Sequence, residues 1–216
     1  MRRFLIALLL LLLAPVLAQA PSQLIPNLTL AKEQIEHWVS SGEYARECEA
    51  VNARARAYLE ANLTGVRRPA LVLDIDETSL SNYPLMLSED FGFEQASFDA
   101  WVEAAQTPPI PSTLELFRYA ESRQVACFFI TGRGEALRAS TEKDLRHGGY
   151  SDWEGLFLKP ADYREKSIVG FKSGVRRQLT EQGYEILVNV GDQMSDLEGG
   201  YAESFYKLPN PMYYIP

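Results

Sequence analysis

Two pairs of aspartates, each beside a short apolar run, are the residues of this sequence best suited to chemistry. Asp74 and Asp76 end the segment ALVLDID, and Asp192 and Asp196 follow the segment ILVNV. Alternation along an extended strand places Asp74 and Asp76 on the same side. Carboxylates a few ångströms apart repel by several kcal/mol even at an effective dielectric of about 20, so gathering them requires a cation. Oxygen ligands with room left for water and phosphate favour Mg²⁺ over zinc.

Two further features supply an anion site and a positive charge. Thr131 and Gly132 follow the apolar run VACFFI and offer a hydroxyl and a backbone turn ahead of a predicted helix, which suits an anion. Lys172, on the helix predicted before the fourth strand, can reach the same crevice, although Lys159 and Lys166 are nearby alternatives. Carboxylates, a divalent metal, a lysine and an anion-binding turn together are typical of phosphoryl transfer.

The elements that must position these residues alternate along the chain. Short apolar runs predict strands at 70–75, 125–130, 156–158, 186–190 and 205–208. Helical spacing of apolar residues lies between them, at 97–105, 112–122, 134–147 and 163–182. Strands that are apolar on both faces and alternate with helices indicate an α/β fold, with a parallel sheet covered on two sides. The ligand crevice of such a sheet lies beyond the carboxyl ends of its strands, where the aspartates, Thr131 and Gly132 fall.

Length and charge limit the class of protein. The chain has 216 residues, of which 46% are hydrophobic, and a formal net charge of −8. We expect one hydrophobic core, and an acidic surface argues against a nucleic acid polymer as partner. A homodimer is the default assembly for a soluble enzyme.

The first twenty residues have the order of a secretory signal peptide. Two arginines precede a leucine-rich run, and small residues follow, so cleavage is expected after Ala18 or Ala20. No cysteine follows the apolar run to carry a lipid. The sequence therefore predicts a periplasmic or secreted protein without a stable membrane anchor after cleavage, with residues 21–216 as the mature domain and 69–216 as its catalytic core.

A helical extension is predicted before the first strand, at 29–62. Its apolar residues recur at spacings of three and four, Thr29 is a candidate N-cap, and Ser40-Ser41-Gly42 divides it into two helices. We expect this extension to cover part of the active site. The Asn-x-Thr triplets that begin at Asn27 and Asn62 are interpreted as turn or helix-cap sequences rather than as glycosylation sites.

The two cysteines leave an alternative open. Export would allow Cys48 and Cys127 to form a disulfide. Cys127 lies within an apolar run, however, where a buried thiol is an ordinary core residue. Geometry decides between these interpretations.

Four motifs, taken together, resemble those of a known family. LVLDIDETSLSN, FFITGR, Lys172 and VGDQMSD match in order and spacing the motifs of the haloacid dehalogenase (HAD) superfamily. More narrowly, they resemble its subfamily IIIB acid phosphatases, which include bacterial class C enzymes and plant vegetative storage proteins, and the closing segment FYKLPNPMYYI is similar to theirs. The resemblance spans about residues 29–216 and implies a HAD-like Rossmannoid fold, a doubly wound parallel sheet with an N-terminal helical extension or cap.

The resemblance also implies a role for each motif. Asp74 would be the nucleophile that forms an aspartyl-phosphate, and Asp76 the acid that protonates the leaving alcohol and then the base that activates water. Lys172 would neutralise the nucleophile and the transferring group. Because Asp76 must be protonated when substrate binds, the resemblance predicts an acidic pH optimum.

The remaining site residues are implied in the same way. Mg²⁺ would be bound by Asp74, the backbone carbonyl of Asp76 and Asp192, with Asp196 helping directly or through water. Thr131 and the Gly132 amide would bind the phosphoryl oxygens. The substrate is a small phosphomonoester, with 5′-nucleotides, sugar phosphates and aryl phosphates left open. The alternative is a phosphate-ester-binding or storage protein with little turnover, which the presence of the nucleophile disfavours.

Other residues receive plainer interpretations. Arg176, one helical turn beyond Lys172, could support the site, but a solvated helix arginine is the favoured interpretation. His147 and the following glycines imitate a histidine phosphatase motif but indicate a helix C-terminus. Aromatic residues follow the first motif, and one or two of them are candidates to line the mouth of the site: Tyr83, Phe91, Phe93, Phe98 and Trp101.

Overall fold

The computed structural model describes residues 26–216, and the predicted signal peptide lies outside this range. Its centre is one parallel sheet of five strands in the order β3-β2-β1-β4-β5. The strands are β1 (Pro69–Leu73), β2 (Ala126–Gly134), β3 (Gly155–Lys159), β4 (Glu185–Gly191) and β5 (Ser204–Lys207). All five predicted strands are confirmed. The motif-bearing strands β1, β2 and β4 lie next to one another at the centre.

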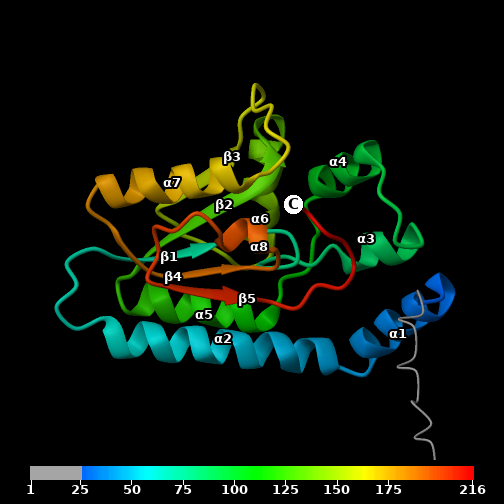
Figure 1. Ribbon diagram of the computed structural model, residues 1–216, viewed down its shortest axis with the longest axis horizontal. Coiled ribbons are helices and arrows are strands. Elements are labelled where there is room, and N and C mark those ends of the chain that lie inside the picture. The colour runs from blue at the N-terminus through cyan, green and yellow to red at the C-terminus, as the bar shows by residue number, and fades with distance from the viewer. Residues whose placement is uncertain (1–25) are drawn as a thin grey trace, which may run out of the picture.

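Helices cover both faces of the sheet. Helices α2 (Glu43–Asn62) and α5 (Pro111–Ser122) pack on one face and α7 (Val169–Glu181) on the other, as Figure 1 shows. Alternate residues of β1 serve the two sides. Leu71 and Leu73 join the larger apolar cluster, whereas Ala70 and Val72 join the smaller one under α7. This two-sided burial is what the apolar runs predicted.

The remaining helices lie near the carboxyl ends of the strands. Helices α3 (Tyr83–Ser88) and α4 (Gln95–Ala104) connect β1 to α5 and extend beyond the end of the sheet (Figure 1). The short elements η1 (Glu135–Leu137) and α8 (Met194–Leu197) follow β2 and β4, and α6 (Arg138–His147) contacts α4. The α3 and α4 segment therefore lies on the side of the sheet where the motifs end.

The N-terminal extension is helical as predicted, but it is placed differently. Helices α1 (Leu28–Ser40) and α2 are separated at Gly42, whose φ of 77° suits glycine. Asn27, not Thr29, caps α1, because its side chain accepts a hydrogen bond from the Leu30 amide at 3.2 Å. Most of the extension, α2, covers a sheet face rather than the site. Helix α1 contacts the end of the α3 region through a Lys32–Asp90 ion pair of 2.6 Å.

Two predicted element boundaries are wrong. The helix predicted at 163–182 begins only at Val169, because Tyr163 closes a turn with Pro160 and its hydroxyl donates to the Ser167 carbonyl. The turn predicted at 131–133 is instead the end of β2, which continues to Gly134 with an irregular register against β3.

Several smaller expectations are also resolved. Cys48 and Cys127 are both buried and free, so the core interpretation holds for both, and burial raises the pKa of the Cys48 thiol to about 11. Gly148 caps α6, with His147 in its last turn. Within residues 26–216, no helix combines the length and the apolar character needed to cross a bilayer.

Candidate active site

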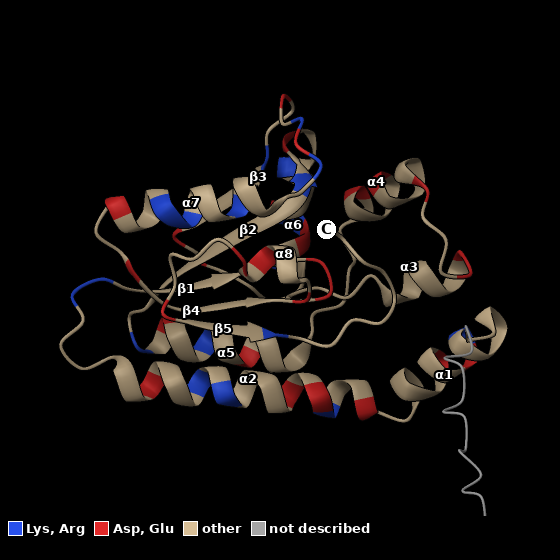
Figure 2. Cartoon of the chain, viewed as in Figure 1, with Lys and Arg blue, Asp and Glu red and all other residues tan. Residues whose placement is uncertain are grey.

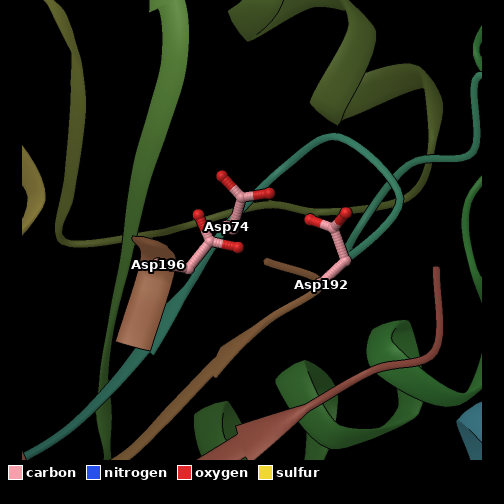
Figure 3. A group of neighbouring side chains, drawn as sticks. All are labelled: Asp74, Asp192 and Asp196. Atoms are coloured by element: carbon pink, nitrogen blue, oxygen red, sulfur yellow. The ribbon is translucent and has the colours of Figure 1, made fainter. Parts of the chain in front are cut away.

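Three buried carboxylates face a common space at the carboxyl ends of β1 and β4. Asp74, Asp192 and Asp196 each offer an oxygen within 4.8 Å of the others, and Figure 3 shows their carboxylates turned toward one another. The sheet register causes this approach. Leu73 pairs with Val190, and the Asp74 amide donates to the Val190 carbonyl at 3.0 Å, so both strands end at the same level.

Lys172 joins two of these carboxylates. Its ammonium Nζ lies 2.5 Å from both Asp74 Oδ1 and Asp196 Oδ1, and its side chain is 5% exposed. Burial alone would lower the pKa of Lys172, but the charges of Asp196 and Asp74 outweigh this effect and raise it. The lysine is therefore charged. It lies at the site as predicted, which removes Lys159 and Lys166 as candidates for this place.

A close backbone approach brings Asp196 into the cluster. A Cβ atom on Gly191 would lie 2.3 Å from the Asp196 Cβ, so the residue before Asp192 must be glycine. Asp196 also belongs to a capping box at the start of α8, in which its Oδ2 accepts from the Gln193 amide at 2.8 Å. One carboxylate thus caps a helix and contacts the lysine.

Arg176 hydrogen-bonds the backbone of the same loop, and the interpretation as a solvated arginine is wrong. Two of the three cations of α7, which Figure 2 shows in blue, are buried, and Arg176 is one of them. Its guanidinium donates to the carbonyls of Asp196 at 2.6 Å and Gly200 at 2.8 Å, and also to that of Glu198. Arg176 therefore holds the backbone that carries Asp196.

Asp192 is held by amide groups rather than by a cation. Its Oδ2 accepts from Asn210 Nδ2 at 2.6 Å and from Gln193 Nε2 at 2.7 Å. Burial, and next the charge of Asp196, raises the pKa of Asp192 to about 7. The sequence had not pointed to Asn210, although the closing segment FYKLPNPMYYI was the signal that could have done so.

The charges of this cluster fit a divalent cation. Three buried carboxylates share one ammonium among the residues described. Burial raises the pKa of Asp74 well above its ordinary range. The charge of Lys172 offsets only part of this rise, and the charges of Asp196 and Asp192 add to it. Such crowded acidic oxygens are the donor set of a hard metal ion, so the residues present fit the expected cofactor.

The side chain of Asp76 belongs to a second buried group instead. Arg133 Nη2 lies 2.9 Å from Asp76 Oδ1, and Arg133 Nη1 lies 3.1 Å from Asp144 Oδ2. Asp144 is further held by the Thr107 amide at 2.9 Å and the Thr107 hydroxyl at 2.7 Å. The expected metal contact of the Asp76 backbone carbonyl stays a prediction. The carboxylate of Asp76 does not belong to the group formed by Asp74, Asp192 and Asp196.

Asn82 also contacts Asp76, and sequence reasoning missed it. Its amide Nδ2 donates to Asp76 Oδ1 at 2.8 Å, while its Oδ1 accepts from the Trp101 indole at 3.0 Å. Trp101 therefore lies next to the site, whereas Phe93 is 72% exposed and packs on Phe98. The role of the aromatic residues toward a substrate stays a prediction.

Thr131 and Gly132 lie at the end of β2, beside β1. Thr131 is buried and its Oγ1 accepts from the Arg133 amide at 3.1 Å, which leaves the hydroxyl hydrogen able to donate. Gly132 is exposed, with open space where a Cβ would be. This environment is compatible with the predicted phosphoryl contacts, which stay predictions.

A parallel α/β sheet with aspartates at the ends of its first and fourth strands and a buried lysine between them defines a HAD-like phosphatase. The chain belongs to the HAD superfamily, subfamily IIIB (acid phosphatase), whose family model matches residues 16–216. The prediction from the four motifs is thereby confirmed.

Individual relatives agree with this family. The chain is 36% identical over 185 residues to acid phosphatase 1 of Solanum lycopersicum, covering 83% of this chain and 72% of the relative. It is 31% identical to vegetative storage protein 1 of Arabidopsis thaliana, covering 84% and 68%. Among solved structures, the class C acid phosphatase from Bacillus anthracis is similar, with a TM-score of 0.70, 25% identity and 86% of each chain covered. Another structure of that enzyme has tungstate bound.

Proposed function

We propose that this protein is an exported, Mg²⁺-dependent acid phosphatase that hydrolyses small phosphomonoesters through an aspartyl-phosphate on Asp74. One observation carries the proposal: Asp74 is buried with Asp192 and Asp196 around a space for a cation, and Lys172 contacts it directly. Membership of an acid phosphatase family supports the same reaction. Export rests on the N-terminal sequence alone.

The first step transfers the phosphoryl group to the protein. A carboxylate oxygen of Asp74 attacks phosphorus, the bond from phosphorus to the ester oxygen breaks, and the proton of Asp76 passes to that oxygen to release an alcohol. Lys172 holds the nucleophile in place and offsets negative charge on the transferring group. Thr131 and the Gly132 amide would donate to the phosphoryl oxygens.

The second step restores the enzyme. Asp76, now a carboxylate, takes a proton from water while the water oxygen attacks phosphorus, and the bond to Asp74 breaks to release phosphate. Asp74, Asp192 and Asp196 would bind Mg²⁺, which supplies charge neutralisation for these steps when bound. Splitting hydrolysis into two displacements is what a carboxylate nucleophile permits.

A storage-type protein with little turnover is the alternative, since vegetative storage proteins are among the relatives. The intact arrangement of Asp74, Lys172 and the second carboxylate pair favours catalysis. A storage role alone does not require this geometry.

Hydrolysis of p-nitrophenyl phosphate by the mature protein at acidic pH, with and without EDTA, tests the proposal. We expect turnover that EDTA abolishes and Mg²⁺ restores, and loss of activity in Asp74→Asn by at least about 1,000-fold. Metal-independent hydrolysis, or full activity in Asp74→Asn, would refute the mechanism. Binding of tungstate to the Mg²⁺-loaded protein, followed crystallographically, should place the anion beside Asp74.

A further inference from the structure

Asn82 is a buried amide that joins the first motif to α4. It lies just before α3 and is 4% exposed. Its side chain contacts Asp76 and Glu77 of the first motif and Trp101 of α4. Glu77 in turn accepts a hydrogen bond from the Tyr213 hydroxyl of the C-terminal segment at 3.2 Å.

The orientation of the Asn82 amide is set by its partners. The indole of Trp101 can only donate, so the oxygen Oδ1 of Asn82 must face it. The NH₂ group then points to the carboxylates, at 2.8 Å from Asp76 Oδ1 and 3.1 Å from Glu77 Oε2. A flipped amide would place two N–H groups against the indole N–H. Trp101 therefore fixes the direction in which Asn82 donates.

This direction makes the two oxygens of Asp76 unequal. Oδ1 receives Asn82 Nδ2 at 2.8 Å, Arg133 Nη2 at 2.9 Å and Arg133 Nε at 3.1 Å. Among residues 26–216, Oδ2 receives only Arg133 Nε, at 3.3 Å. An oxygen that already accepts three N–H groups has no lone pair free for a proton, whereas Oδ2 does.

We propose that Asn82 and Arg133 assign the transferable proton of Asp76 to Oδ2, and that Asn82 is a positioning residue which links this assignment to α4 through Trp101. As the ester bond breaks, the proton leaves Oδ2 for the leaving oxygen, and Asp76 remains as a carboxylate. The inference rests on the proposed acid role of Asp76. It adds the residues that orient that acid.

The dependence of activity on the leaving group separates positioning from mere structural support. A p-nitrophenolate departs without a proton, but an alkoxide needs one, so loss of a well-placed acid slows alkyl esters selectively. We would compare kcat/KM for p-nitrophenyl phosphate and ethyl phosphate, since kcat/KM reports the phosphoryl transfer step. Asn82→Ala should lower kcat/KM for ethyl phosphate by about 10- to 100-fold and that for p-nitrophenyl phosphate much less.

Asn52 provides a matched control. It is also a buried asparagine, at 3% exposure, but its amide donates to Ser112 and Thr113 at 2.9 Å, with no contact to the motifs. Asn52→Ala should lower stability without changing the ratio between the two esters. Asp76→Asn is the reference that shows how large the selectivity becomes when the acid itself is lost.

Trp101→Phe tests the link to α4 and keeps the ring that packs there. Losing the indole N–H frees the Asn82 amide to flip. Trp101→Phe should therefore also slow ethyl phosphate more than p-nitrophenyl phosphate, by a smaller factor than Asn82→Ala does. Trp38→Phe is its control, because the Trp38 indole donates to Glu47 Oε1 at the same 3.0 Å outside the site. In the Asn82→Ala background, Trp101→Phe should change the ratio no further.

The outcomes of this comparison are distinct. If Asp76→Asn lacks leaving-group selectivity, the acid role in the proposed function is wrong. If Asp76→Asn shows it while Asn82→Ala slows both esters equally, the positioning inference is overturned and the proposed function stands. If Asn82→Ala does not fold, Trp101→Phe decides alone, and an unchanged ratio there contradicts the inference.

Discussion

Two buried cations, Lys172 and Arg133, each join carboxylates at the same edge of the sheet, but they leave their partners in different states. Lys172 contacts Asp74 and Asp196 at a single atom, 2.5 Å from each. Arg133 spreads its nitrogens over Asp76 and Asp144, with the closest pairs at 2.9 and 3.1 Å. A lysine is a point charge, whereas an arginine is a rigid fork whose separate nitrogens can bind two carboxylates at once.

The difference separates a site that needs a cation from one that is complete. Around Lys172 a third carboxylate, Asp192, has no cationic partner among the residues described. Around Arg133 the inner carboxylate, Asp144, is fully buried and hydrogen-bonded by Thr107, whereas the side chain of Asp76 is partly exposed. The choice of lysine or arginine thus accompanies the difference between the proposed metal centre and the proposed support of the acid.

The strongest test removes each cation in turn. Lys172→Met should lower kcat/KM by about 100- to 1,000-fold, because charge stabilisation of the transferring group is lost. Arg133→Met should lower the free energy of unfolding by about 3 to 5 kcal/mol, because Asp144 is left buried and unpaired.

Urea unfolding with and without MgCl₂ distinguishes the two variants. Mg²⁺ should stabilise Lys172→Met more than the wild type, since a repelling charge is gone, and Arg133→Met no more than the wild type. Equal stabilisation of both variants would break the comparison.

The unpartnered carboxylate predicts a pH dependence. Because the pKa of Asp192 is raised to about 7 in the metal-free fold, the folded protein keeps a proton that the unfolded chain releases near pH 4. This group therefore favours folding most at acidic pH, and its contribution is lost as pH rises from about 4 to about 7. Mg²⁺ must displace the same proton, so its affinity should fall by up to about tenfold per unit below pH 7.

Calorimetric titration with MgCl₂ across this range measures the effect. Asn210→Leu removes a donor that stabilises the ionised form of Asp192. It should therefore move the midpoint of the pH dependence of Mg²⁺ affinity to higher pH. Magnesium affinity that is constant between about pH 6 and pH 8 would exclude a protonated Asp192 in the metal-free site.

The same contrast explains what the sequence could predict. Asp74 and Asp192 follow apolar runs, and parallel strands bring their carboxyl ends together, so their meeting was foreseeable. Asp196 and Lys172 were located by motif spacing. The central strands β1, β2 and β4 were predictable because they are buried on both faces, whereas α3 and α8 are too short to show a period.

The contacts around Asp76 could not be foreseen, although Asn82 and Arg133 end two of the quoted motifs, LVLDIDETSLSN and FFITGR. Asn82, Arg133 and Asp144 lie on three different segments, and no local pattern says which loop residue another will meet. The interpretation of Arg176 was wrong for a related reason. Its partners are backbone carbonyls of the loop 196–200, and such partners cannot be recognised from residue types. Polar contacts between distant segments are set by the fold, whereas the positions of the strands along the chain follow from local pattern.

Two glycine-to-alanine substitutions, at Gly191 and Gly174, test the proposed metal centre with the smallest change in side-chain size. Gly191→Ala would bring a Cβ to 2.3 Å from Asp196 Cβ and 2.5 Å from its Oδ2, so Asp196 must leave its place beside Lys172. We expect about a 100-fold loss of kcat/KM and weaker Mg²⁺ binding. Gly174→Ala is the control: it lies within α7, has open space around it, and should raise the free energy of unfolding by about 0.5 to 1 kcal/mol through helix propensity. Wild-type kinetics in Gly191→Ala would show that the contact between Asp196 and Lys172 is dispensable, because the substitution cannot leave that contact unchanged.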